Sequence, residues 1–143
     1  MSRRETPMTR WYWEQVGGSL IEEFIIVTRK QGAAGHAQRL LDGLIIRDGK
    51  REIITHDGGN TDITGKDVIV IQTKNSRLGM CLMGQTLFSM QLVMELHPCR
   101  VESIALCAKN DDKLRPMLEQ YPGCKVVVCP EIVCSQLSNN RRK

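Results

Sequence analysis

The chain is poor in aromatic residues and contains no long apolar run. Aromatic residues make up 4% of the 143 positions, so few side chains are available to stack on the bases of single-stranded nucleic acid. No apolar run approaches the roughly 18–20 residues that a membrane-spanning helix needs. The first residues lack the apolar segment of a signal peptide. We therefore expect a cytoplasmic protein without a membrane contact.

Two further motif classes are missing. No expected strand is followed by a glycine-rich phosphate loop such as GxxxxGK or GxGxxG, which disfavours a nucleotide-binding α/β protein. The six cysteines form no CxxC pair, and most of them lie in apolar runs. Cys124, Cys129 and Cys134 follow one another at five-residue intervals, but zinc ligands normally come in tight pairs. We expect buried, reduced thiols.

The remaining composition is that of an ordinary globular domain. Hydrophobic residues make up 41% and charged residues 25%, and the net charge of +4 is a mild bias towards anionic partners. We expect one domain over residues 1–143, with frayed ends at 1–8 and 138–143.

Hydrophobic patterning predicts alternating helices and strands. Trp13, Val16, Leu20 and Phe24 recur at helical spacing, although Gly17-Gly18 weakens that helix. The expected elements are a helix at 9–24, a strand at 24–28, strands at 39–47 and 52–55 joined by an Asp48-Gly49 hairpin turn, a strand at 67–74, a helix at 77–96, a strand at 101–108, a short helix at 111–120 and a strand at 125–129. One apolar, core-facing stripe of the helix at 77–96 carries Leu78, Cys81, Leu82, Phe88, Leu92 and Leu96. These elements predict an α/β fold, a mixed β-sheet flanked by helices.

Polar residues interrupt two apolar strands. The strand at 67–74 is apolar enough to be buried on both faces, yet Gln72 and Lys74 alternate onto one face at its end. Asp42 is likewise flanked by apolar residues. A buried carboxylate is costly unless it is paired or binds a metal ion. If the strands are neighbours, Asp42 and the Gln72 amide oxygen could hold Mg²⁺ (or Mn²⁺), with Lys74 stabilising charge on a phosphate. The alternative is a buried Lys–Asp pair that fixes strand register.

These residues carry a resemblance to a known family. Leu41-Asp42-Gly43-Leu44-Ile45 followed by Val70-Ile71-Gln72-Thr73-Lys74 resembles the PD-(D/E)XK nuclease core, closest to the D…QxK branch of Mrr-type restriction endonucleases. The resemblance covers roughly residues 17–128. It implies a restriction-endonuclease-like core with the order α-β-β-β-α-β, here with an extra C-terminal α-β.

The resemblance also implies further site residues. Members usually place a Glu on the first helix, and Glu23, preferred over Glu22 because it lies on the core-facing stripe, would join Asp42 and Gln72 as a metal ligand. Gln85 on the second helix is a weaker candidate. Substrate phosphate could be contacted by the residues that open that helix, Asn75, Ser76 and Arg77.

The expected function is that of a Mg²⁺-dependent nuclease acting on DNA, with RNA as a further possible substrate. A chain this small has little surface for sequence readout, so we expect a homodimer or a partner subunit that supplies specificity. A Met-rich second helix could supply the dimer contact. The alternative is a catalytically weak or inactive nuclease-fold protein that acts as a nucleic-acid-binding or scaffold subunit, because Gln72 replaces a more common acidic residue.

Overall fold

The computed structural model describes residues 5–27 and 38–140, so residues 1–4 and 141–143 of the expected frayed ends lie outside the description. The helices are α1 (Thr6–Val16), α2 (Met80–Met94), α3 (Leu114–Glu119) and α4 (Glu131–Asn140). The strands are β1 (Ser19–Glu22), β2 (Ile25–Val27), β3 (Arg39–Leu40), β4 (Gly43–Ile46), β5 (Glu52–Ile54), β6 (Asp67–Arg77), β7 (Arg100–Lys109) and β8 (Cys124–Val128).

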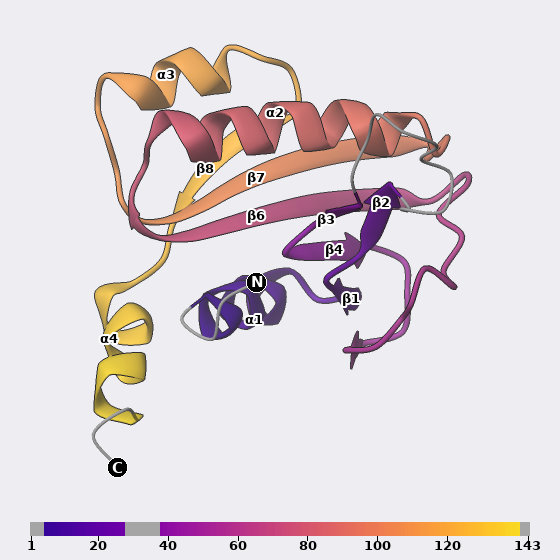
Figure 1. Cartoon of the computed structure of the whole chain (residues 1–143), viewed down its shortest axis with the longest axis horizontal. Coiled ribbons are helices and arrows are strands. Elements are labelled where there is room, and N and C mark those ends of the chain that lie inside the picture. Colours follow the sequence, from indigo (N-terminus) through magenta and orange to yellow (C-terminus); the bar gives the residue numbers. More distant parts are fainter. Residues whose placement is uncertain (1–4, 28–37, 141–143) are drawn as a thin grey trace.

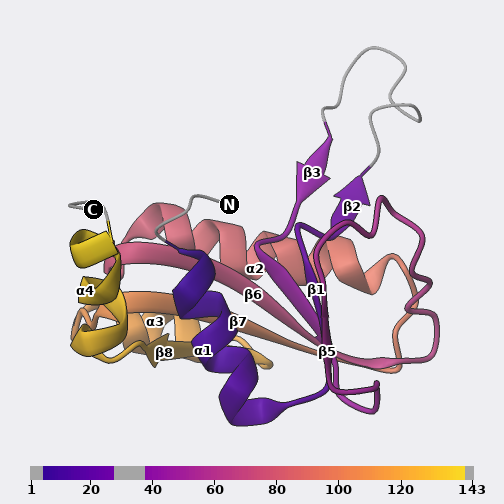
Figure 2. The same cartoon turned by 90° about the horizontal axis from the view of Figure 1, so that it is seen from below.

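Six strands form one mixed sheet in the order β5-β1-β4-β6-β7-β8. The pairs β1–β4 and β4–β6 are antiparallel, whereas β6–β7, β7–β8 and β1–β5 are parallel. The expected α/β class is therefore confirmed. Strands β2 and β3 form a separate ribbon that projects away from the sheet (Figure 2).

The helices cover both faces of the sheet. Helices α2 and α3 lie on one face, and α1 and α4 lie on the other (Figure 1). Alternate residues of β6 enter the two layers: Ile69 and Ile71 share a buried cluster with Met8 of α1, while Val68 and Val70 share one with Val93 of α2. Burial of this central strand on both faces was predicted and is confirmed.

The first helix ends earlier than predicted. Instead of running to Phe24, α1 stops at Val16, because Gly17 and Gly18 adopt left-handed backbone angles of φ 78° and 79°. The indole N–H of Trp13 donates to the carbonyl oxygen of Gly18 at 2.7 Å and holds this bend. The apolar residues that follow form strand β1. At the helix start, Met8 is fully buried, although the sequence placed it in a frayed end.

The predicted hairpin between 39–47 and 52–55 is wrong. The first segment is broken at Leu41-Asp42 into β3 and β4, and β5 pairs in parallel with β1 rather than with β4. The Ser19 hydroxyl donates to the carbonyl oxygen of Lys50 at 2.5 Å. This bond holds the chain beyond the Asp48-Gly49 turn against the outer edge of β1.

The second half of the chain follows the prediction more closely. Strand β7, helix α3 and strand β8 lie within three residues of their expected bounds. Strand β6, however, continues to Arg77 because it pairs with β7 as far as Lys109, so α2 begins only at Met80. Helix α4 was not predicted. Among the helices described, none combines the length and apolarity that crossing a bilayer requires.

Candidate functional site

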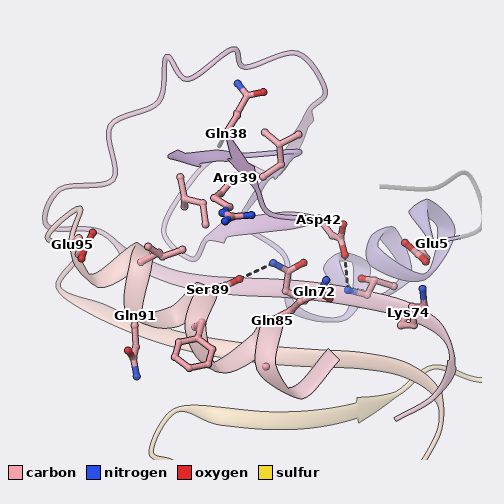
Figure 3. A pocket seen from close by; sticks show the side chains of 16 residues that line it. Glu5, Gln38, Arg39, Asp42, Gln72, Lys74, Gln85, Ser89, Gln91 and Glu95 are labelled. Atoms are coloured by element: carbon pink, nitrogen blue, oxygen red, sulfur yellow. Dashed lines mark hydrogen bonds between the residues drawn. The ribbon is translucent and has the colours of Figure 1, made fainter. Parts of the chain in front are cut away.

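Four of the predicted site residues line one cavity of about 840 Å³. Asp42, Gln72 and Lys74 come from the β4–β6 region of the sheet, and Gln85 comes from α2 (Figure 3). The predicted convergence of the Asp-containing strand and the Gln-x-Lys strand is therefore found in the structure. The cavity lies on the α2 face of the sheet.

Strand register explains why Asp42 and Gln72 meet. Gly43 pairs with Ile71 across the antiparallel β4–β6 ladder, so one further step places Asp42 beside Gln72. The Asp42 carboxylate accepts a hydrogen bond from the backbone N–H of Thr73 at 2.7 Å. Thr73 itself points to the α1 face, where its hydroxyl lies 2.8 Å from that of Thr9. Asp42 is thus held where β3 gives way to β4.

The surroundings of Asp42 disfavour its ionised form. Burial raises its pKa, the hydrogen bond from Thr73 lowers it in part, and the negative charges of Glu5 and Glu23 raise it further. A carboxylate in this environment favours either a proton or a cation.

Gln72 is buried, with 6% of its surface exposed. Its amide nitrogen donates to the hydroxyl of Ser89 on α2 at 2.8 Å, as Figure 3 shows. Because the amide nitrogen donates to Ser89, the amide oxygen of Gln72 is the atom available to a ligand. This hydrogen bond also ties β6 to α2 and so fixes the two walls of the cavity relative to each other.

Lys74 lies on the same face of β6 as Gln72, as the two-residue alternation predicted. Its side chain is exposed at the cavity, and in the described part of the chain it forms no ion pair within 4 Å. The alternative of a buried Lys–Asp pair is therefore wrong. An exposed ammonium at a cavity wall is able to contact an anionic ligand.

The prediction that Glu22 or Glu23 lies on the first helix is wrong. Glu22 is in β1, and Glu23 follows it in a turn at φ 54°. Both line a second, smaller cavity beside Asp57 rather than the cavity of Asp42. The carboxylate of Glu22 is also paired with the Arg10 guanidinium through two hydrogen bonds of 2.9 Å.

Two carboxylates that line the cavity of Asp42, those of Glu5 and Glu95, were not predicted from the sequence. Glu5 precedes the first turn of α1 and raises the pKa of Asp42 through its charge. The helix was expected to begin at Thr9, and the acidic residues predicted for the site, Glu22 and Glu23, lie near its expected far end. Starting the helix at the Thr6-Pro7 pair, a favoured N-terminal signal, would have pointed to Glu5.

The predicted phosphate-contacting residues do not join this site. Asn75, Ser76 and Arg77 belong to the end of β6, so they do not open α2 as predicted. They line a third cavity together with Lys109 and Glu131. In the described ranges, no group of three His, Cys, Asp or Glu side chains is arranged to hold a metal ion, and the six cysteines are free thiols.

Comparison of the chain with protein-family models, with curated proteins and with solved structures finds no match. The resemblance to nucleases therefore depends on the residues of this chain and on their arrangement.

Proposed function

We propose that the chain is a divalent-metal-dependent phosphodiesterase of the PD-(D/E)XK type that cleaves DNA. The observation that carries the proposal is the cavity shared by Asp42, Gln72 and Lys74. Asp42 and Gln72, which are distant in the sequence, meet there in the order that the resemblance to the D…QxK branch implies.

The order of the elements supports the same proposal. Helix α1, strands β1, β4 and β6, helix α2 and strand β7 follow one another as α-β-β-β-α-β. Within the sheet, β1, β4, β6 and β7 are consecutive neighbours. The remaining strands lie at the edges or in the projecting ribbon, so they extend this core without interrupting it.

The donor set fits a hard cation. Asp42 and the Gln72 amide oxygen would hold Mg²⁺ or Mn²⁺, and Glu5 takes the place proposed for a first-helix carboxylate. Two carboxylates and one neutral oxygen bring enough negative charge for one divalent ion. When bound, such an ion withdraws charge from a phosphate and lowers the pKa of a coordinated water.

The side chains of this site have separable roles. Asp42 and Gln72 are fixed by Thr73 and Ser89, so little reorganisation is needed when a ligand binds. Lys74 is exposed and carries a positive charge that would contact a non-bridging phosphate oxygen, stabilising the charge that develops there. Gln85 lines the cavity on the α2 side and would orient the substrate.

The test is incubation of the full chain with plasmid, linear duplex and single-stranded DNA in Mg²⁺ or Mn²⁺. We expect metal-dependent cleavage of at least one substrate, loss of cleavage in Lys74→Ala, and no change in Lys66→Ala. Lys66 is an exposed lysine outside the cavity lining, so it controls for general loss of charge. Cleavage that is equal in Lys74→Ala would contradict the proposal.

A second candidate is a catalytically inactive protein with the same fold that binds nucleic acid or acts as a scaffold. The neutral Gln72 favours it, because an amide contributes no charge to metal binding. Direct titration of metal separates the candidates: the nuclease binds Mn²⁺ through Asp42, and the scaffold does not.

We further propose that the protein works as a homodimer. Helix α2 exposes 77% of Met80 and 56% of Met94, which gives an apolar contact to a second copy. Light scattering over a range of concentrations tests this; a monomer at the highest concentration contradicts it.

A further inference from the structure

Phe88 occupies an unexpected position for one of the few aromatic residues in this chain. Its spacing predicted a place on the buried stripe of α2, with Leu82 and Leu92. That prediction is wrong: 62% of Phe88 is exposed, while Leu82 is buried. Exposing a phenyl ring forfeits the stabilisation that its burial in the core would give. The ring instead lines the cavity that contains Asp42.

The lining around Phe88 has the chemistry of a nucleobase site. Of the described residues that line the cavity, Phe88 alone is aromatic, and Ile26, Leu40 and Leu92 add apolar surface. The amide side chains in the lining are Gln38, Gln72, Gln85 and Gln91. A base presents an apolar face and an edge of hydrogen-bond donors and acceptors, which matches rings and amides better than a phosphate does.

Side chains that are able to contact a base lie on two opposite sides of the cavity. Gln85 precedes Phe88 by three residues on α2, so their side chains start on neighbouring turns of the same helix face. Arg39 of β3 lies across the cavity from α2 (Figure 3). Guanidinium groups stack on bases as phenyl rings do. The volume of about 840 Å³ falls within the roughly 300–1,000 Å³ of small-ligand sites.

We propose that this cavity receives one unpaired nucleobase, stacked on Phe88 and hydrogen-bonded by Gln85, beside Asp42 and beside Lys74, which contacts the phosphate. The inference rests on the proposed function for the position of the phosphate, and it deepens that function by naming the substrate class. The substrate is single-stranded DNA or a locally unpaired segment, because a base within a duplex cannot present its face to the ring.

Binding without cleavage tests this proposal. A fluorescent single-stranded DNA 12-mer, the same 12-mer with one central abasic site, and the matching duplex are titrated with the full chain in EDTA. We expect the intact single strand to bind more tightly than the duplex and roughly fivefold more tightly than the abasic strand, since stacking on one aromatic ring is a substantial share of single-strand affinity.

Three variants isolate the ring. Phe88→Leu keeps an apolar side chain but removes the stacking face, and it should weaken single-strand binding by roughly tenfold. Phe88→Tyr keeps the ring and should bind as the parent does. Tyr121→Leu removes an exposed aromatic ring outside the cavity lining, and it should also bind as the parent does.

The outcomes are distinct. Equal affinity of the parent and Phe88→Leu for the intact 12-mer overturns the base site, as does equal affinity for intact and abasic strands. A dimer that dissociates in Phe88→Leu while DNA affinity stays unchanged also overturns it and makes the ring a subunit contact. Failure of the proposed nuclease shows separately, as an absence of metal-dependent cleavage in a parent chain whose base-dependent binding is intact.

Discussion

The Asp42 carboxylate accepts a hydrogen bond of 2.7 Å from the backbone N–H of Thr73. That bond joins the residue before β4 to the middle of the Gln-x-Lys segment of β6. It fixes the carboxylate beside Gln72 without neutralising it, because a backbone N–H carries no formal charge. The carboxylate is therefore positioned by the backbone of the sheet.

This arrangement predicts how stability depends on pH. Burial raises the pKa of Asp42, so the folded chain holds this proton more tightly than the unfolded chain, in which the pKa is about 3.9. The protonated carboxyl of Asp42 therefore adds to the free energy of unfolding. This contribution is complete below a pH of about 3.9 and is lost as the pH rises through the pKa of Asp42 in the folded chain. Asp42→Asn, which keeps an acceptor for Thr73, should therefore gain stability relative to the parent as the pH rises from about 4 towards 7. Chemical denaturation at several pH values measures this, and a difference that is constant with pH contradicts it.

Glu5 is predicted to share the cation with Asp42. Glu5→Gln should weaken Mn²⁺ binding by about threefold to tenfold, because it removes one of the three carboxylate charges that line the cavity, those of Glu5, Asp42 and Glu95. It should also lower the pKa of Asp42, which moves the acidic limb of the pH–rate profile to lower pH. Glu14→Gln removes an exposed carboxylate from the same helix away from the cavity. Calorimetric titration of the two variants compares them; identical Mn²⁺ affinities would remove Glu5 from the site.

Gln72→Glu should bind metal at least as tightly as the parent but fold less stably without it. The substitution buries a second carboxylate near Asp42, which we expect to lower the free energy of unfolding by about 2 kcal/mol. Mn²⁺ should restore most of that loss. Ser89→Ala removes the acceptor of the Gln72 amide and should cost about 1–3 kcal/mol with no rescue by metal. Thermal melts with and without Mn²⁺ distinguish these patterns. A melting temperature of Gln72→Glu that does not change with Mn²⁺ would contradict the assignment of residue 72 as a metal ligand.

Lys74→Ala should separate metal binding from cleavage. Lys74 makes no ion pair with Asp42 in the part of the chain that is described, so its removal leaves the donor set intact. We expect Mn²⁺ affinity within twofold of the parent and a rate of cleavage lower by about 10²–10³-fold, the range seen when a group that stabilises developing charge is removed. A large loss of metal affinity would make Lys74 a structural part of the site.

The sequence predicted the parts of this site that depend on local alternation. The apolar run of β6 identified a strand buried on both faces, and the two-residue period placed Gln72 and Lys74 on one face. Asp42 stood out because it is charged among apolar neighbours. Each of these patterns involves only a few adjacent residues, so the prediction from it stays correct even where the predicted ends of a helix or strand are wrong.

The sequence could not predict features that depend on pairing at long range. The segment after the Asp48-Gly49 turn joins β1, because a contact between Ser19 and Lys50 holds it at that edge. Two consecutive glycines end α1, so residues with helical spacing become β1 instead. The same errors moved the expected acid from Glu5 to Glu22 and Glu23. Phe88 was placed in the core because helical spacing does not say which face of α2 borders the cavity.

The most direct test of the account is Mn²⁺-dependent cleavage of DNA by Asp42→Asn beside the parent and Asp48→Asn. Asp48 is an exposed acid in the turn after β4, outside the cavity lining, so its substitution removes the same charge from another place. We expect the parent and Asp48→Asn to cut DNA and bind Mn²⁺, whereas Asp42→Asn remains folded and does neither. Cleavage by Asp42→Asn at the rate of the parent would contradict the assignment of this cavity as a nuclease site.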